Sequence, residues 1–218
     1  MDNKPHSDDK KVTFIEYDEK RPGLAHIHIN GKKAFSMPSF DAGLLERGQE
    51  IPADEIAKRS LEDEKQRCWA TALRLLAVRS QSRAELKKKL MAKAFGKVAV
   101  EMALSRAQGA GYIDDEAFAR QWIESRMRSK PKGRYLLKQE LKGKGVDEPI
   151  IEKLLSEELF DETQMARLLI EKRAWKWKKL DDFRFKQKAC AYLAGKGFTY
   201  DIASEAVEAF LSLAETDE

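Results

Sequence analysis

The fold is decided by RAELKKKLMAKAF at residues 83–95 and by two later stretches with the same pattern, RYLLKQELKGKGV at 134–146 and KQKACAYLAGKGF at 186–198. Each stretch begins with a cation, has a leucine seven residues later, and has alanine or glycine four residues after that leucine. The leucines are Leu90, Leu141 and Leu193, which lie 51 and 52 residues apart. A pattern kept in register at such a spacing is typical of an internal repeat, in which each copy is one supersecondary unit.

Each copy is predicted to contain three helices, and the quoted stretches form the second helix of each. Ser82 begins a capping box that ends at Glu85, and Asp114 is placed as the N-cap of a helix with an acidic first turn. The expected helices span 66–79, 82–93 and 97–109, then 115–129, 133–143 and 148–159, then 162–179, 182–194 and 200–213. Helix triplets that share their cores only with their neighbours stack as a solenoid. The expected fold is therefore mainly α, with three tandem three-helix repeats in an elongated curved array.

The front of the chain predicts a small α+β module. Residues 11–16 and 24–29 alternate apolar and polar side chains as strands do, and Asn30-Gly31 is a strong hairpin signal before a strand at 32–36. Short helical segments are expected at 40–46 and from residue 53, with a charged connection at 60–66. The predicted organisation is a disordered start at 1–10, the α+β module with its β-hairpin at 11–60, repeats at 61–113, 114–160 and 161–214, and an acidic tail at 215–218.

The 218 residues are 42% hydrophobic and 36% charged, yet the net charge is only +4. This hydrophobic share excludes wholesale disorder, and no apolar run approaches the roughly 20 residues that span a bilayer. The basic excess is local. Residues 61–198 carry 31 basic and 20 acidic side chains, whereas residues 199–218 carry no basic and six acidic side chains. Two cysteines in apolar stretches and a polar start without a signal pattern predict a cytoplasmic protein with no membrane contact.

Candidate catalytic and metal-binding residues are few. His26 and His28 share one face of a predicted strand but lack a third ligand, so a solvated or hydrogen-bonded pair is favoured over a metal site. The carboxylates of 114–116 stand at a helix start, where stabilising the helix dipole is favoured over metal or acid–base chemistry. No phosphate-binding loop and no nucleophile–base set is recognisable. We therefore expect no catalytic residue, no metal, no cofactor and no enzymatic activity.

Basic side chains are the more informative feature. In the middle copy Arg134, Lys138 and Lys142 follow each other at i, i+4 and i+8, where like charges repel, so an anionic partner would explain the row. In the third copy tryptophan alternates with lysine, which fits single-stranded nucleic acid and equally an acidic protein surface. The candidate partner- or DNA-binding residues are Lys87, Lys88, Arg126, Arg128, Lys130, Lys132, Arg134, Lys138, Lys142, Lys176, Trp177, Lys178 and Lys179.

A simpler role is weighed against each of these features. A lysine-rich helix face is commonly only solvated, and for 87–89 this is the favoured interpretation. Trp69, Trp122 and Trp175 fall in predicted first helices and are expected to anchor the cores. Trp177 lies two residues from Trp175 and cannot share its face of a helix. It therefore either packs against a neighbouring element or belongs to a binding surface.

Several motifs in this order resemble the RecX family. They are RSQSR at 79–83, GYIDDEAFA at 111–119, Gly133, Glu140-Leu141 and KGV at 144–146, and the resemblance covers about 66–213. It implies three tandem three-helix repeats, and an N-terminal module similar to the extension of some members. It also implies a turn at Gly111, packing of Tyr112 and Phe118 between repeats, and a cap at Asp114 or Asp115. The motif residues given structural roles are Ser82, Glu85, Leu90, Gly111, Tyr112, Asp114, Asp115, Phe118, Leu141, Gly145, Leu193 and Gly197.

The resemblance further implies a regulatory protein that binds the RecA recombinase filament on DNA. We expect a monomer that inhibits recombinase ATPase, strand exchange and coprotease activity in DNA repair and the SOS response, with weak or indirect contact to single- or double-stranded DNA. An alternative is a stand-alone DNA-binding protein with helix-turn-helix-like units, for which the basic excess is modest and which a steep salt dependence would reveal. A third possibility is a structural helical adaptor that binds neither filament nor DNA.

Overall fold

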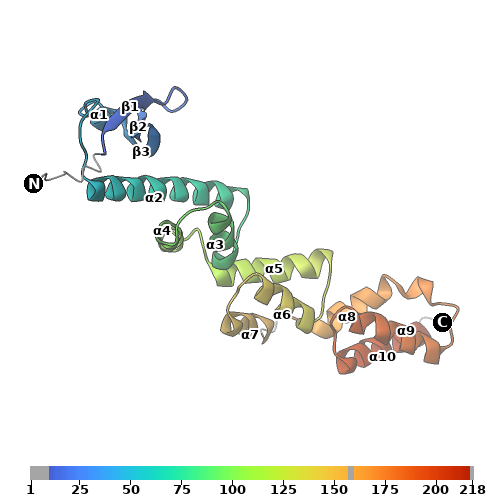
Figure 1. Ribbon diagram of the computed structural model, residues 1–218. Helices are drawn as coiled ribbons and strands as arrows, with labels where there is room; N and C mark the ends of the chain where they lie inside the picture. Colours follow the sequence, from blue (N-terminus) through green and yellow to red (C-terminus); the bar gives the residue numbers. More distant parts are fainter. Residues whose placement is uncertain (1–9, 157–159, 217–218) are drawn as a thin grey trace, which may run out of the picture. The chain divides into compact units, whose positions relative to one another are not determined.

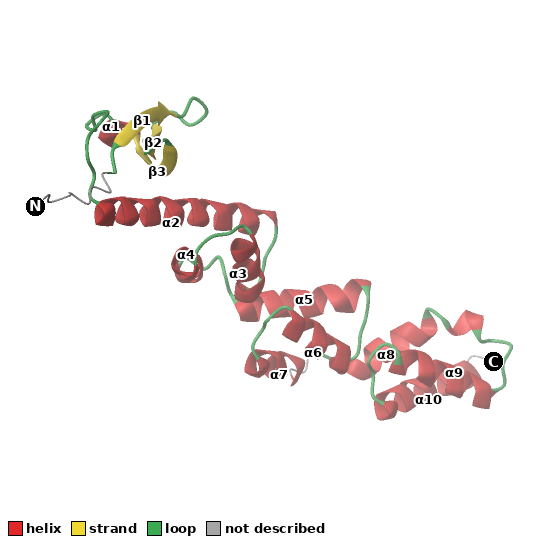
Figure 2. Cartoon of the chain, in the orientation of Figure 1, coloured by secondary structure: helices red, strands yellow, loops and turns green. Residues whose placement is uncertain are grey.

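The computed structural model describes residues 10–156 and 160–216, and most of them are helical (Figures 1 and 2). Of the predicted segments, the disordered start lies outside the described residues except for Lys10, and so do the last two residues of the acidic tail. Contacts divide the chain into two compact units, Met1–Val78 with Lys87–Gly109 and Arg79–Leu86 with Ala110–Glu218. The elements in chain order are β1 (Val12–Tyr17), β2 (Leu24–Ile29), β3 (Lys32–Pro38), α1 (Ser39–Ala42), α2 (Ala53–Val78), α3 (Arg83–Ala92), α4 (Lys97–Gly109), α5 (Asp115–Ser129), α6 (Arg134–Gly143), α7 (Glu148–Ser156), α8 (Glu162–Glu171), the 3₁₀ helix η1 (Ala174–Lys176), α9 (Asp182–Ala194) and α10 (Tyr200–Thr216).

The three strands form an antiparallel sheet in the order β1-β2-β3, as the alternating pattern predicts. Asn30 and Gly31 have φ angles of 49° and 78°, the left-handed conformations that a two-residue hairpin turn requires. The buried side chains of Val12, Ile27 and Phe35 form the core of this module together with residues of α1 and of the following loop. The predicted hairpin is confirmed.

Helix α2 corrects the prediction of a charged connection at 60–66. It runs without interruption for 26 residues from the N-terminal module into the first repeat, packing on β3 and on α4. Its charged segment is helical because ion pairs one turn apart support it, with 2.6 Å between Glu55 and Arg59 and 3.0 Å between Asp63 and Arg67. No glycine or proline interrupts the segment after Pro52. The charged segment is therefore part of a continuous helix and not a linker.

Helix α8 is shorter than the predicted span of 162–179. It ends at Glu171, and the chain continues through η1 in successive turns, with Trp177 N donating to Ala174 O at 2.8 Å. The ring of Trp177 packs edge-on against Phe185 at 5.8 Å and Tyr192 at 5.7 Å between ring centroids. This tertiary packing overrides the helix propensity of the local sequence. The first-to-second helix connection of the third repeat is consequently longer than the other two.

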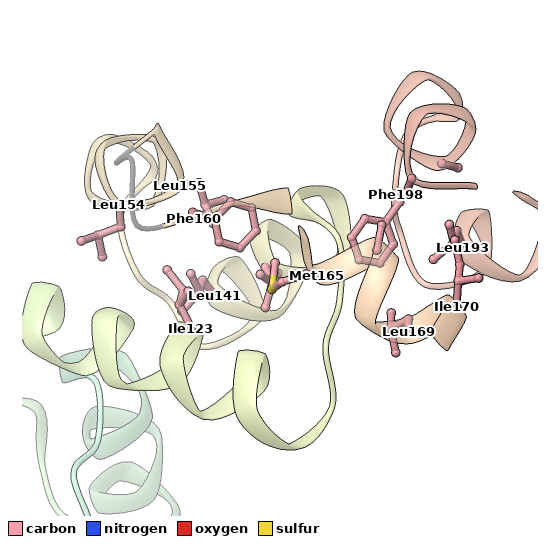
Figure 3. Close-up of a cluster of buried hydrophobic side chains, with 14 of the residues drawn as sticks. Ile123, Leu141, Leu154, Leu155, Phe160, Met165, Leu169, Ile170, Leu193 and Phe198 are labelled. Carbon is pink, nitrogen blue, oxygen red and sulfur yellow. The ribbon is translucent and has the colours of Figure 1, made fainter. Parts of the chain in front are cut away.

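The second and third repeats share one continuous hydrophobic core, part of which Figure 3 shows. Leu141 of α6 and Leu193 of α9 are fully buried, as is Leu90 of α3 in the first repeat. Met165 and Phe160 of the core lie between side chains of the second repeat and those of the third (Figure 3). The leucines that define the repeat in the sequence are thus core positions of all three copies.

Two or three residues after the end of each second helix, one residue adopts a left-handed conformation. Gly145 and Gly197 have φ angles of 72° and 89°, and Ala94 of the first repeat has 62°. A side chain raises the energy of this conformation by about 1 kcal/mol, so Ala94→Gly is expected to raise the free energy of unfolding by about 0.5–1 kcal/mol in urea denaturation. The control Ala92→Gly, at the last residue of α3, relieves no positive φ angle and is expected to lower the free energy of unfolding by less than about 1 kcal/mol, the cost of glycine inside a helix. Equal destabilisation by both variants would contradict the prediction.

Candidate partner-binding surface

The start of α3 is bonded to the end of α6, one repeat later in the chain. The buried hydroxyl of Ser82 donates to Lys144 O at 2.5 Å and accepts a hydrogen bond from Glu85 N at 3.0 Å. Lys144 Nζ binds Glu85 Oε1 at 2.9 Å, and Arg83 N donates to Asp115 Oδ1 at 2.8 Å. Burial raises the pKa of this Asp115 carboxyl above its ordinary value. Residues of the predicted capping box are therefore bonded to α5 and to the end of α6, within the compact unit Arg79–Leu86 with Ala110–Glu218.

The start of α6 is bonded to the end of α9 in a similar way. Gly133 N donates to Lys196 O at 2.9 Å, and Arg134 N donates to Glu162 Oε1 at 2.8 Å. Glu162 is the first residue of α8, as Asp115 is the first residue of α5. At the starts of both α3 and α6, the first backbone N–H of the helix thus donates to a carboxylate from the first residue of a later helix.

Glycines allow the close contacts at the starts of α3 and α6. A Cβ atom on Gly145 would overlap the side chain of Ala84, and one on Gly197 would lie 2.5 Å from Leu136 Cγ. Both glycines also have positive φ angles, which side chains disfavour. These contacts explain the glycines at the last but one position of the second and third repeated stretches.

The other motif residues lie around the first helix of the second repeat. Asp114 caps α5 by accepting a hydrogen bond from Ala117 N at 2.9 Å, and Gly111 turns the chain with a φ of 73°. Phe118 is buried and stacks on Trp122 at 6.3 Å between ring centroids. Tyr112, in contrast, is 56% exposed, which does not fit a buried position between repeats.

Two of the predicted binding cations converge on one half-buried carboxylate, Glu140 of α6. Arg126 Nε donates to Glu140 Oε2 at 2.8 Å, Lys132 Nζ binds Oε1, and Trp122 Nε1 donates to Oε2 at 2.8 Å. Burial opposes ionisation of Glu140, but these three hydrogen bonds outweigh it and lower the pKa from an ordinary 4.5 to about 2. The guanidinium of Arg126 also lies 4.3 Å from the ring centroid of Trp122. Arg126 and Lys132 are therefore engaged within the repeat.

The cationic row on α6 is compensated by carboxylates of the chain itself. Lys138 Nζ pairs with Glu148 Oε1 at 2.6 Å and also with Glu152, and Lys142 Nζ pairs with Glu148 Oε2 at 2.7 Å. The hydrogen bonds from both lysines lower the pKa of Glu148 to about 2. The third cation of the row, Arg134, lies 3.5 Å from Glu162. The anionic partner that the row was expected to need is thus supplied largely from within.

Other predicted cations are exposed and uncompensated. Arg128 in the last turn of α5 and Lys130 directly after the helix have no ion pair among the described residues, and the same holds for Lys88 on α3. Lys87 differs, because it pairs with Glu101 of α4 at 2.5 Å. The available positive charge of the second repeat therefore lies at the end of α5 and not along α6.

In the third repeat the structure contradicts the expected role of Trp175 and selects one of the two alternatives for Trp177. Trp175 was expected to anchor a core, but it is 66% exposed, with Lys176 Nζ 5.1 Å from its ring centroid. Trp177 packs into the shared core, so the alternative of a neighbouring element is the one realised. Trp175, Lys178, Lys179 and the α9 residue Lys188 line one hollow of about 470 Å³. Sequence reasoning missed Lys188, because no local pattern connects it to a segment about ten residues earlier.

The two histidines of the sheet are hydrogen-bonded. His26 Nδ1 lies 3.0 Å from Ser36 Oγ and its Nε2 3.2 Å from Asp18, while His28 Nε2 lies 3.2 Å from Glu16. Among the residues that the structure describes, no group of three or more histidine, cysteine or acidic side chains is placed to hold a metal ion. In the same part of the chain, no helix combines the length and apolar character needed to cross a membrane.

The repeats match known family models one by one. Residues 68–106 match the model described as RecX, first three-helix domain, 114–155 match the second three-helix domain, and 161–207 match the third. The chain belongs to the RecX family. Its mainly helical fold, with a small antiparallel sheet before three family domains, agrees with the fold class predicted from the sequence.

Curated relatives extend this match over most of the chain. The regulatory protein RecX of Pelodictyon phaeoclathratiforme is 36% identical over 129 residues, which are 59% of this chain and 79% of the relative. The regulatory protein RecX of Clostridium perfringens is 30% identical over 205 residues, 90% of this chain and 94% of the relative. Family membership therefore includes part of the N-terminal module as well as the repeats.

Solved structures of RecX proteins have a similar fold. A crystal structure of regulatory protein RecX aligns with a TM-score of 0.68 and 25% identity, covering 93% of this chain and 99% of that one. RecX from Lactobacillus salivarius aligns with a TM-score of 0.64 and 23% identity, covering 68% and 97%. The second of these comparisons supports the fold alone.

Proposed function

We propose that this RecX-family protein binds the RecA–DNA filament and inhibits recombinase ATPase, strand exchange and coprotease activity. The observation that supports this most directly is that all three repeats, and not one isolated module, match the family. In this proposal it acts in the cytoplasm, as a monomer, without a cofactor and without catalytic activity of its own.

The connection between the second and third repeats gives this proposal a physical basis. Gly133 N donates to Lys196 O and Arg134 N donates to Glu162 Oε1, and the two repeats share one hydrophobic core. A recombinase filament is itself a repeating polymer, so similar surfaces held in series can contact neighbouring subunits together. Linked weak contacts then gain avidity, and a ligand that bridges subunits hinders the motions coupled to ATP hydrolysis.

The charges of the second repeat indicate which residues would make such contacts. The α6 row is compensated by Glu148, Glu152 and Glu162, whereas Arg128 and Lys130 are exposed without an ion pair among the described residues. Uncompensated cations at the end of α5 are available to an acidic surface or to phosphate. We therefore expect Arg128 and Lys130 to contribute more to filament binding than Lys138 and Lys142.

The test is ATP hydrolysis by RecA on single-stranded DNA with near-stoichiometric amounts of the full chain. We expect the protein to lower the rate of ATP hydrolysis. The double variant Arg128→Ala/Lys130→Ala should lower it less, because the loss of these contacts weakens the combined binding of the linked repeats. The matched control Lys32→Ala/Lys33→Ala removes the same charge from the exposed hairpin and should inhibit as the parent does. An unchanged rate with the parent protein would refute the proposed function.

A further inference from the structure

The connection between α8 and α9 carries an exposed tryptophan surrounded by lysines. Trp175 is 66% exposed, and Lys176 Nζ lies 5.1 Å from its ring centroid. Lys178 and Lys179 follow, and Lys188 of α9 lines the same hollow. We call this group, Trp175 with the four lysines, the Trp175 surface.

The Trp175 surface is held in place by the second tryptophan of the segment. Trp177 packs edge-on against Phe185 and Tyr192, and its backbone N donates to Ala174 O at 2.8 Å. Leu180 N donates to Trp177 O at 2.9 Å, so the chain on both sides of Trp177 is hydrogen-bonded. Because the backbone next to Trp175 is held in this way, less conformational entropy is lost when a ligand binds than at a loose loop.

The lysines of the Trp175 surface are available to an anion. None of the four has an ion pair with a carboxylate among the described residues. The nearest acidic side chains in sequence open α9, where Asp181 is engaged as the N-cap, accepting from Arg184 N at 2.9 Å, and lies 3.5 Å from Arg184 Nε. This differs from the second repeat, where carboxylates of the chain neutralise most of the cations.

We propose that the Trp175 surface binds single-stranded DNA, with a base stacked on Trp175 and phosphates beside Lys178, Lys179 and Lys188. An exposed indole offers an apolar face that a base can cover, and cations around it can follow the backbone. Duplex DNA offers no free base face to a single ring. An acidic protein surface would use the lysines but has no need of the indole.

The proposal is tested with the full chain and a labelled deoxythymidine oligonucleotide, without recombinase, so that its outcome is independent of the proposed function. Trp175→Ala is expected to weaken binding about tenfold in fluorescence anisotropy, whereas Trp175→Phe should retain most of the affinity. The control Phe183→Ala removes another exposed aromatic ring of the third repeat, 76% exposed, and should leave the affinity unchanged. Equal affinities of the parent and Trp175→Ala would overturn the proposal.

The lysines and the bases are tested separately. Lys178→Ala/Lys179→Ala should reduce the slope of log affinity against log salt by about 0.7 per lysine, and Lys32→Ala/Lys33→Ala should not. On an abasic strand of the same length the parent and Trp175→Ala should bind equally, because only the phosphates remain. The parent should therefore bind the abasic strand more weakly than the oligonucleotide. Undiminished affinity of the parent for the abasic strand, or an acidic peptide that binds the parent as tightly as the oligonucleotide does, would overturn the assignment to single-stranded DNA.

Discussion

Gly133→Ala is expected to lower the free energy of unfolding by about 2 kcal/mol, a typical cost of forcing an extra methyl group into a closed contact. A Cβ atom at this position would lie 2.6 Å from Phe198 N and closer still to Gly197 O, so the backbone of the third repeat would have to move. The same movement would weaken the hydrogen bond from Gly133 N to Lys196 O. Alanine tolerates the backbone at this site, where φ is −67°, so the effect would be steric. Urea denaturation followed by circular dichroism measures it.

A matched control lies at the other end of the same helix. Gly143 closes α6, and a Cβ atom there would meet no atom within 4 Å. Gly143→Ala is therefore expected to raise the free energy of unfolding by about 0.5–1 kcal/mol through helix propensity alone. If both variants shift the unfolding midpoint in the same direction and by the same amount, the prediction that the close contact at Gly133 makes Gly133→Ala destabilising is wrong.

The repeat and its helices could be predicted because their determinants are local. Leu90, Leu141 and Leu193 are fully buried, and a residue shortly after the end of each second helix has a left-handed backbone conformation. Asn30-Gly31 specifies its hairpin in the same way, since the conformation depends on the two residues themselves. Signals of this kind are visible in one sequence without knowledge of tertiary contacts.

The end of α8 could not be predicted, because its cause is tertiary. The residues from Lys172 to Lys179 have acceptable helix propensities, and the chain leaves the helix to bury Trp177 against Phe185 and Tyr192. The same packing leaves Trp175 exposed, so the roles of the two tryptophans depend on contacts with α9. Their spacing alone predicted only that they cannot share a helix face.

The compensation of the basic row could not be predicted either. Lys138 and Lys142 repel each other within α6, and this repulsion is visible in the sequence. Their partner Glu148 belongs to α7, and the partner of Arg134, Glu162, belongs to α8. Only the packing of the helices brings these carboxylates to the row. A prediction of binding residues from charge patterns therefore has to await the positions of opposite charges on neighbouring helices.

Glu140→Gln is expected to lower the free energy of unfolding by about 2 kcal/mol at neutral pH, because hydrogen bonds to charged groups are the strong ones and their loss leaves partly buried charges unpaired. The carboxylate binds Arg126, Lys132 and Trp122, and its side chain is 20% exposed. The glutamine amide keeps the shape but cannot balance two cations. Urea denaturation of both proteins measures the difference.

The matched control is Glu152→Gln in the same repeat. Glu152 is 52% exposed, and its partner Lys138 keeps a second carboxylate in Glu148. Exposed ion pairs contribute little, so the change in unfolding free energy is expected to stay below about 0.5 kcal/mol. A control variant as unstable as Glu140→Gln would mean that the loss reflects the overall charge of the repeat and not the half-buried cluster.

The contribution of Glu140 should also depend on pH in a defined direction. Its pKa is lowered from 4.5 to about 2 in the folded protein, since the hydrogen bonds from Lys132, Arg126 and Trp122 outweigh the cost of burial. Stabilisation by a carboxylate with a depressed pKa is complete above its unfolded value and is lost as the pH falls through its folded value. The stability difference between the parent and Glu140→Gln is therefore expected to stay constant above about pH 5 and to shrink from pH 4.5 towards pH 2. Other carboxylates titrate equally in both proteins, so a difference that stays constant over this range would contradict the depressed pKa of Glu140.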